Sequence, residues 1–267
     1  MRFRPDSAGW LTVFTALFVA LWGLSPRLAG VIGNSPAAFA AAQLVLTVLW
    51  VGITIGIVRH IAGLRLRFWG RAGGFVISAA LLVLAVQLRL WPPLANLCLI
   101  YGAAFLGCMV SGIFREPNIL LPVALMSPLV DFWTVSAGPV RRVLEHRPEV
   151  LEVVAAGVPA AGQLAPLAFV GLGDFMFIAM FLAAADRLRM NSRRTAATFF
   201  VLVSLAMALV VFWSGFAGVG VPGMVVIGLG FVAANLRHFR LSRQEALITS
   251  GLVIAVAILV AVIVRER

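Results

Sequence analysis

The chain has 267 residues, of which 62% are hydrophobic and 12% are charged, and its mean hydropathy is +1.06. Soluble domains are about half apolar and roughly a quarter charged, so this composition excludes a soluble globular protein and predicts a polytopic membrane protein. The formal net charge of +11 comes from arginine alone, because the chain has no lysine. These arginines lie in short loops between apolar runs, where membrane topology and anionic lipid headgroups explain them better than nucleic acid does.

Nine apolar runs are candidates for transmembrane helices, since a span needs about 20 mostly apolar residues. In chain order they cover residues 8–24, 37–58, 73–91, 94–113, 118–137, 164–185, 195–216, 218–236 and 246–264. Proline, glycine and arginine fill the gaps between them, as in the basic loop at 59–71. The sequence therefore predicts an all-α polytopic membrane protein with about nine transmembrane helices in a single domain over 1–267.

The distribution of arginine predicts the orientation of these helices. With the N-terminus inside and the C-terminus outside, the inside segments hold 14 arginines and the outside segments hold seven, which the positive-inside rule favours. The longest loop, 138–163, then lies outside. Its segment 140–145 suits an interfacial amphipathic helix, and an ordinary solvated connector fits the same residues equally well.

Other residue types predict no metal site and no disulfide. Cys98 and Cys108 lie on one apolar run, which indicates core residues. The three histidines lack the HExxH spacing of a membrane zinc protease and lie in arginine-rich loops; they are His60, His146 and His238. Several tryptophans are expected to anchor helices at the membrane interface, namely Trp10, Trp50, Trp69, Trp91 and Trp213.

Two acidic residues, Asp131 and Asp174, fall within apolar runs, whereas the other eight of the ten lie in loops, tails or at a helix end. An ionisable side chain inside a span costs about 2.5–3.5 kcal/mol on insertion scales, and it marks a functional site by default. On the predicted boundaries, both lie about 10–15 Å below the same membrane face, at 1.5 Å per residue. Consecutive antiparallel helices would therefore bring the two carboxyl groups together.

Two carboxyl groups at close range share one proton, because like charges a few ångströms apart cannot both ionise. One can then act as general base on a water molecule while the other donates a hydrogen bond to a substrate carbonyl. The alternative is structural: each aspartate would only accept hydrogen bonds from a neighbouring helix or pair with an arginine. Gly171 and Gly173 favour the first interpretation, because they leave space for an extended substrate strand beside Asp174.

The stretch Gly171-Leu172-Gly173-Asp174-Phe175 resembles the GxGD signature of presenilins and signal peptide peptidases, the intramembrane aspartyl proteases. Val130-Asp131-Phe132-Trp133 lies where that family carries Tyr-Asp, and Val221-Pro222-Gly223-Met224 lies where it carries Pro-Ala-Leu. The resemblance covers roughly 128–235 and implies a presenilin-like bundle with Asp131 and Asp174 as the catalytic dyad. It further implies a set of substrate-binding residues: Gly171, Gly173, Pro222, Gly223 and Met224.

This resemblance divides the domain into N-terminal helices (1–117), a catalytic core (118–237), and a C-terminal loop with the last helix (238–267). The chain departs from the family pattern at Val130, which replaces a tyrosine, and at Pro-Gly-Met, which replaces Pro-Ala-Leu. The aspartates also lie on the fifth and sixth predicted helices rather than on the sixth and seventh. With loop 138–163 outside, the orientation resembles that of signal peptide peptidase. These departures leave a non-catalytic homologue open.

The sequence thus predicts an intramembrane aspartyl endopeptidase that cleaves transmembrane segments or signal peptides, with no metal and no organic cofactor. Its expected partners are transmembrane peptides and the lipid bilayer, and its expected location is the bacterial inner membrane. Prepilin peptidases also carry GxGD but pair it with more polar surroundings. A proton- or cation-coupled transporter or channel could use the same paired carboxylates, and a helical scaffold without chemistry is the third alternative.

Overall fold

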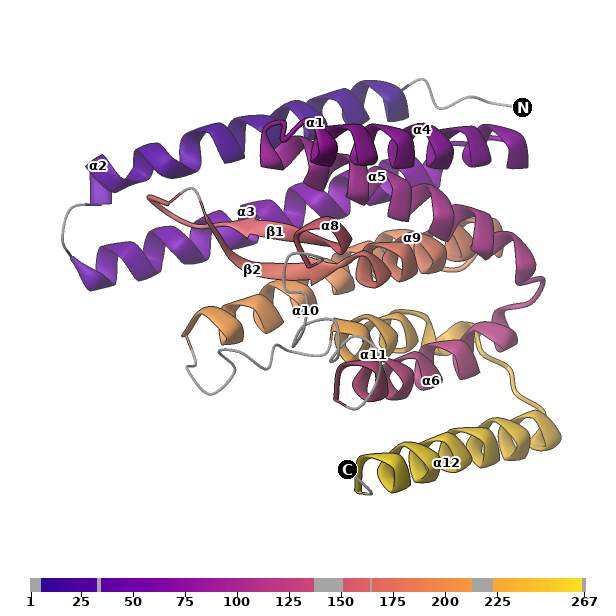
Figure 1. The fold of residues 1–267 in the computed structure, drawn as a ribbon. Helices are drawn as coiled ribbons and strands as arrows, with labels where there is room; N and C mark the ends of the chain where they lie inside the picture. The colour runs from indigo at the N-terminus through magenta and orange to yellow at the C-terminus, as the bar shows by residue number, and fades with distance from the viewer. Residues whose placement is uncertain (1–5, 33–34, 137–150, 164, 213–222, 266–267) are drawn as a thin grey trace.

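The computed structural model describes residues 6–32, 35–136, 151–163, 165–212 and 223–265. Over these residues the chain is mostly helical (Figure 1), and nine of its helices have 13 or more residues. They are α1 (Asp6–Leu24), α3 (Pro36–Gly63), α4 (Phe68–Gln87), α5 (Pro92–Val110), α6 (Pro117–Ser136), α9 (Leu172–Arg187), α10 (Ser192–Phe212), α11 (Gly223–Asn235) and α12 (Arg243–Arg265). Each of the nine predicted apolar runs overlaps one of these helices.

Five helices in the described part of the chain are long and apolar enough to cross a membrane: α1, α3, α4, α5 and α10. By this criterion of length and composition, the chain is an integral membrane protein. Two further apolar stretches are shorter, at Pro117–Trp133 and Gly223–His238. The count of nine transmembrane helices stays a prediction for the remaining four, as does the orientation. The amphipathic helix predicted at 140–145 lies outside the described residues.

The all-α prediction misses one feature, a two-stranded antiparallel hairpin. Strand β1 (Ala155–Pro159) follows the short helix α8 (Leu151–Val154) and pairs with β2 (Pro166–Gly171). The sequence predicted a helix from 164, because a short apolar run does not distinguish a buried strand from a helix. Instead α9 begins only at Leu172. Asp174 therefore lies in the first turn of its helix and not eight to ten residues into it.

Local sequence accounts for several helix ends. The hydroxyl of Ser35 accepts a hydrogen bond from the backbone N–H of Ala38 at 3.4 Å, and Pro36 follows as the first helical residue of α3. At α12, Ser242 and Glu245 form a capping box, in which each side chain accepts a hydrogen bond from the other's backbone N–H, at 2.7 and 3.2 Å. The side chain of Asn118 binds the backbone of Arg240, which ties the start of α6 to the segment before α12.

Helix α6 contains two internal prolines, Pro122 and Pro128. A proline has no backbone N–H, so the carbonyl four residues before it loses its helical donor. The carbonyl of Ala124, four residues before Pro128, accepts a hydrogen bond from the Ser127 hydroxyl at 3.4 Å instead. The same carbonyl lies against Gly228 of α11, where any side chain would collide with it. Small residues of this kind let membrane helices approach closely.

The helices form a bundle around α3, α5 and α9. Helix α5 packs against α4 and α9, α3 packs against α1, α9 and α10, and α11 lies between α10 and α6, with α12 beyond α6 (Figure 1). The hairpin packs against α3 and α5. Several large side chains are fully buried in this core, among them Phe18, Trp50, Phe181, Phe199 and Phe231. The rings of Phe181 and Phe231 stack with centroids 4.3 Å apart, which joins α9 to α11.

At the far end of α9 from the hairpin, two arginines bind the C-terminal end of α5. The Arg71 guanidinium donates to the Cys108 carbonyl at 2.8 Å. Arg187 donates to the carbonyls of Gly112, Ser111 and Phe114, the first at 3.1 Å. The two guanidinium groups lie close enough to repel one another. Cations complete the unpaired carbonyls at a helix C-terminus, so this arginine pair stabilises the junction of α4, α5 and α9.

Candidate active site

Asp174 is positioned by the junction of β2 and α9. Gly171 ends the strand and is the N-cap of the helix, with φ −65° and ψ 149°, so Asp174 is the third helical residue. Its carboxylate accepts a hydrogen bond from the backbone N–H of Gly171. This is the position from which an acidic side chain caps a helix. Helix capping thus accounts for one interaction of the Asp174 carboxylate. Capping does not account for the position of the second aspartate.

Asp131 lies on α6 and is partly buried, and its carboxylate accepts a hydrogen bond from the backbone N–H of Met224 in the first turn of α11. The preceding residue, Gly223, lies against Asp174. A Cβ atom on Gly223 would be 2.5 Å from Oδ1 and 2.8 Å from Cγ of Asp174. Two consecutive residues of α11 therefore contact the two aspartates, and the carboxyl groups interact electrostatically with each other.

The helix termini explain how two acids can be kept together in apolar surroundings. Asp174 lies in the first turn of α9, and the first turn of α11 donates to Asp131. A helix N-terminus carries a partial positive charge and unpaired N–H groups, and it stabilises a nearby carboxylate. Repulsion between the two carboxylates opposes a double charge. The arrangement therefore favours one negative charge shared by the pair, with one acid ionised and the other protonated.

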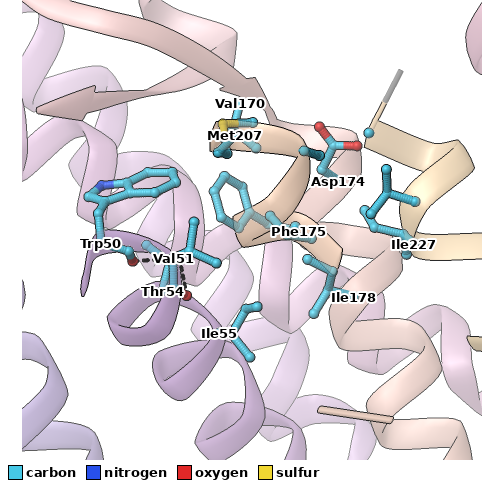
Figure 2. A pocket seen from close by; sticks show the side chains of 14 residues that line it. Trp50, Val51, Thr54, Ile55, Val170, Asp174, Phe175, Ile178, Met207 and Ile227 are labelled. Atoms are coloured by element: carbon cyan, nitrogen blue, oxygen red, sulfur yellow. Dashed lines mark hydrogen bonds between the residues drawn. The ribbon is translucent and has the colours of Figure 1, made fainter. Parts of the chain in front are cut away.

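A small cavity lies beside Asp174, between α3, α9, α10, α11 and the end of β2. Figure 2 shows Trp50 and Asp174 on opposite sides of Phe175, whose ring meets the Trp50 indole edge-on at 6.1 Å. The walls are apolar apart from Asp174 and the hydroxyl of Thr54. This hydroxyl donates to the carbonyl oxygens of Trp50, at 2.9 Å, and Val51, at 3.0 Å. The Asp174 carboxyl group is thus the polar end of an otherwise apolar cavity.

The hairpin is held in place by two side-chain amides from distant helices. Gln43 of α3 accepts from the Ala161 backbone N–H at 2.7 Å and donates to the Pro159 carbonyl at 3.2 Å. Asn96 of α5 accepts from the Gly157 backbone N–H at 3.3 Å. Both amides are buried, where an unpaired polar group is costly. They cover the edge of β1 that faces away from β2.

The same hydrogen bonds show which backbone groups of β2 face outward. Gly157 uses its N–H on Asn96, and it is paired with Phe169 across the hairpin. In an antiparallel pair both residues face each other with their polar groups or both face away. The polar groups of Phe169 therefore face the outer edge of β2. Among the described residues they have no hydrogen-bond partner there.

The structure brings together most of the site residues predicted from sequence. Asp131 contacts Met224, Asp174 contacts Gly223, and Gly171 lies 3.7 Å from Asp174 Oδ2, measured from its ideal Cβ position. Gly173 faces open space, since no atom lies within 4 Å of its ideal Cβ. Pro222 lies outside the described residues, as do Val221 and the Gly138-Pro139 turn.

Some residues of the site were not found from sequence. Trp50, expected at the membrane interface, is 1% exposed and lines the cavity, whereas Trp10, Trp69 and Trp91 are exposed. Trp213 lies outside the described residues. Gln43 and Asn96 carried a usable signal, because amide side chains inside apolar spans need internal partners, and their partners lie in the hairpin.

Comparison of the chain with models of protein families, with curated proteins and with solved structures finds no match in any of the three. The site is therefore interpreted from its own geometry. Within the described residues, no cluster of three His, Cys, Asp or Glu side chains could hold a metal ion.

Proposed function

We propose that the chain is an intramembrane aspartyl protease in which Asp131 and Asp174 activate water to cleave a transmembrane peptide. One observation carries the proposal. The start of α11 contacts both carboxyl groups through adjacent residues, Gly223 and Met224, so both acids lie beside the same helical turn. A purely structural role for each aspartate does not require the two like charges to meet.

The proposed reaction uses one ionised and one protonated carboxyl group. The ionised aspartate takes a proton from a water molecule as its oxygen attacks the substrate carbonyl carbon. The protonated aspartate donates a hydrogen bond to the carbonyl oxygen, which gains negative charge. When the C–N bond breaks, a proton passes from the dyad to the leaving amine. The pair ends with one proton, as it began, and water is the only co-reactant.

The open edge of β2 supplies a place for the substrate. A peptide bond inside a helix is shielded, so a substrate must unwind and can pair as a strand with an exposed sheet edge. Phe169 offers outward backbone groups there, and the strand runs directly into the helix that carries Asp174. The open space beside Gly173 leaves room for the paired chain to reach the carboxyl groups.

The resemblance of the motifs to those of presenilins and signal peptide peptidases supports the same function. One departure from the family motif also has a structural explanation. The family motif has alanine where this chain has Gly223, and a Cβ at this position would overlap the Asp174 carboxyl group. The glycine thus allows α11 to pack closer to the dyad. The absence of a tyrosine at Val130 bears on efficiency and substrate choice.

The decisive test is cleavage in liposomes of a panel of transmembrane substrates with glycine-containing centres. We expect Asp131→Asn and Asp174→Asn each to lower the rate by about 10²–10⁴-fold, the usual contribution of a general acid or base. Asp186→Asn, an exposed acid at the other end of α9, is the matched control and should cleave like wild type. Equal cleavage by all variants contradicts the proposal. If wild type cleaves nothing while a pH-sensitive dye reports proton flux lost in both dyad variants, transport is the better function.

A further inference from the structure

Asp174 lies deep in the bundle, so a reaction that consumes water needs a way for water to reach it. At the hairpin tip, the Gly162 N–H donates to the Ser25 carbonyl in the turn between α1 and α3 at 2.8 Å, which places the tip at one end of the bundle. The chain from this tip through β2 to Asp174 covers roughly 20 Å at about 3.3 Å per strand residue, and α9 covers a similar length to its other end. Bulk water is excluded at such a depth in a membrane.

Helix α3 carries a buried polar face that runs from the hairpin to the cavity beside Asp174. At 3.6 residues per turn, its four hydrogen-bonding side chains lie within roughly 60° of one another, and each is at most 2% exposed. They are Gln43, Thr47, Trp50 and Thr54. Gln43 binds the hairpin backbone at one end of this face, and Thr54 lines the cavity at the other.

Part of the hydrogen-bonding capacity of this polar face is not used by the protein. The Trp50 indole N–H is buried and has no partner among the described residues, and Figure 2 shows its nitrogen on the side of the ring away from Asp174. The Thr47 hydroxyl accepts from the Gln43 amide at 3.1 Å and donates to no group in the described part of the chain. Buried polar groups that lack a protein partner are commonly satisfied by internal water.

The cavity at the inner end of the polar face has the size of a water site. Its volume of about 30 Å³ holds one or two water molecules, since one molecule needs roughly 10–15 Å³. Apolar walls alone would leave so small a cavity dry. The Asp174 carboxyl group and the Thr54 oxygen change this, because each can accept a hydrogen bond from water. The hydroxyl hydrogen of Thr54 is engaged by backbone carbonyls, which leaves its lone pairs as acceptors.

We propose that the polar face of α3 is the route by which water reaches the dyad, and that the cavity holds one or two water molecules bound to Asp174 and Thr54. The proposal rests on the proposed protease function and adds the source of its water. Water enters at the hairpin end, passes the Thr47 hydroxyl and the Trp50 indole N–H, and stops in the cavity. A molecule consumed at the dyad is replaced from the cavity without opening the site to bulk solvent.

The first experiment detects this water without cleavage. Wild type in liposomes is mixed rapidly with heavy-oxygen water and exposed to a short X-ray pulse, which converts nearby water to hydroxyl radicals, and hydroxylation of single residues is measured by mass spectrometry. We expect hydroxylation of Phe175, which is buried and lines the cavity. Phe181, which is buried on the same helix and stacks on Phe231 instead, is the matched control and should stay unmodified. An unmodified Phe175 overturns the water site.

Two isosteric variants test the inner and outer parts of the route separately. Thr54→Val removes the acceptor in the cavity, so hydroxylation of Phe175 should fall, and an undiminished level overturns the binding role of Thr54. Thr47→Val should leave the final level unchanged but slow the entry of heavy oxygen at Phe175, and an unchanged rate overturns the route along α3. Ser78→Ala removes a buried hydroxyl that donates four residues back on α4 and is the control for both.

Filling the cavity tests its use in catalysis. Ala206 is buried and lines the cavity, so Ala206→Val should displace the water. We expect kcat to fall by about 10²-fold, the effect of misplacing a reacting group by about 1 Å, with KM little changed because the substrate pairs with β2. Ala197→Val, the same change on the exposed face of α10, is the control. If Ala206→Val fails to fold, Thr54→Val decides, because it adds no volume and should also lower kcat.

The experiments separate the water site from the protease. Hydroxylation of Phe175 without cleavage of any substrate by wild type supports the water site and rejects the protease. Cleavage that depends on both aspartates, with Phe175 unmodified and with full kcat in Ala206→Val and Thr54→Val, supports the protease and rejects the water site.

Discussion

The two ends of α9 carry like-charge pairs of opposite sign. At the N-terminus, Asp174 lies near Asp131, and at the C-terminus, roughly 20 Å away at 1.5 Å per residue, Arg187 lies near Arg71. Both pairs match the sign that the helix ends prefer. The two pairs differ in whether neighbouring backbone groups occupy their hydrogen-bonding capacity. The arginines donate to four carbonyls at and just beyond the end of α5, whereas the carboxyl groups lie beside an apolar cavity and an open strand edge.

This difference shows that a charge at a helix terminus, or even a like-charge pair, does not identify a functional site. The arginine pair is explained by the carbonyls that it satisfies. The aspartate pair has capping partners too, but a cavity lies beside Asp174. We therefore expect changes at the carboxyl end to act on cleavage and changes at the arginine end to act on stability.

After removal of either aspartate, the largest effect is expected from Gly223→Ala, which would disturb the carboxyl end without removing an ionisable group. The added Cβ would lie 2.5 Å from Asp174 Oδ1, so α11 or the carboxyl group must shift. A displacement of about 1 Å in a catalytic group can cost about 10²-fold in rate. We expect such a loss in the liposome cleavage assay. Gly251→Ala on α12, where no atom lies within 4 Å of the new Cβ, is the control, and equal rates for both variants would show that the close packing at Asp174 is irrelevant.

A second variant, Gln43→Leu, tests whether the hairpin at the carboxyl end depends on distant support. It would leave the Ala161 N–H and the Pro159 carbonyl buried without their partner. We expect the free energy of unfolding to fall by about 1–3 kcal/mol, with faster hydrogen exchange in 155–161. Thr47→Val removes the Gln43 contact that does not reach the hairpin and should have little effect on that exchange. Unchanged protection of 155–161 in Gln43→Leu would mean that the hairpin is stable without the Gln43 side chain.

At the arginine end, Arg187→Ala should lower stability and leave cleavage per folded molecule unaffected. The carbonyls of Gly112 and Phe114 lose the guanidinium donor, and the Ser111 carbonyl keeps only the backbone N–H of Phe114. Because the side chain is partly exposed and water can replace it, we expect a loss of only about 1 kcal/mol. Thermal unfolding measures the loss, with Arg193→Ala on α10 as the control. A selective loss of cleavage in Arg187→Ala would contradict the division of roles between the two ends.

The smallest effect concerns Glu245, an acid at a helix N-terminus without a second acid. The backbone N–H and hydroxyl of Ser242 hold the pKa of Glu245 below its usual value. Its contribution to stability is therefore complete above the ordinary glutamate pKa of about 4.3 and is lost as the pH falls through the lower pKa of the folded state. We expect hydrogen exchange at the start of α12 to rise in that window in wild type, while Glu245→Gln shows no such step. A matching step in Glu245→Gln would assign the titration to another group.

The sequence located every long helix of the described chain, because hydropathy and the proline, glycine and arginine gaps are local signals. It did not reveal the hairpin, since the run from Pro166 to Gly171 is as apolar as a helical segment of that length. What makes it a strand is its pairing with β1, and β1 is fixed by Gln43 and Asn96 from more than 50 residues away. Such distant contacts are not readable from a short window.

For the candidate site, the sequence supplied the residues and not their geometry. Asp131 and Asp174 were singled out by their cost in an apolar run, and their proximity was argued from equal depth in two helices. In the structure Asp174 lies in a first turn, and the start of α11 contacts both acids. Trp50 was assigned to the interface because tryptophan usually lies there, and only the packing of α3 against α9 places it in the cavity wall.

The two prolines of α6 have a mechanical consequence for the acid that follows them. Asp174 stands on α9, whose middle is locked among buried alanines and phenylalanines of the core. Asp131 stands three residues beyond Pro128 on a helix that lacks two of its internal donors and is therefore easier to bend. Asp174 is therefore held on a rigid helix, whereas Asp131 is held on a more flexible one. Flexing of α6 would therefore change the separation of the two carboxyl groups.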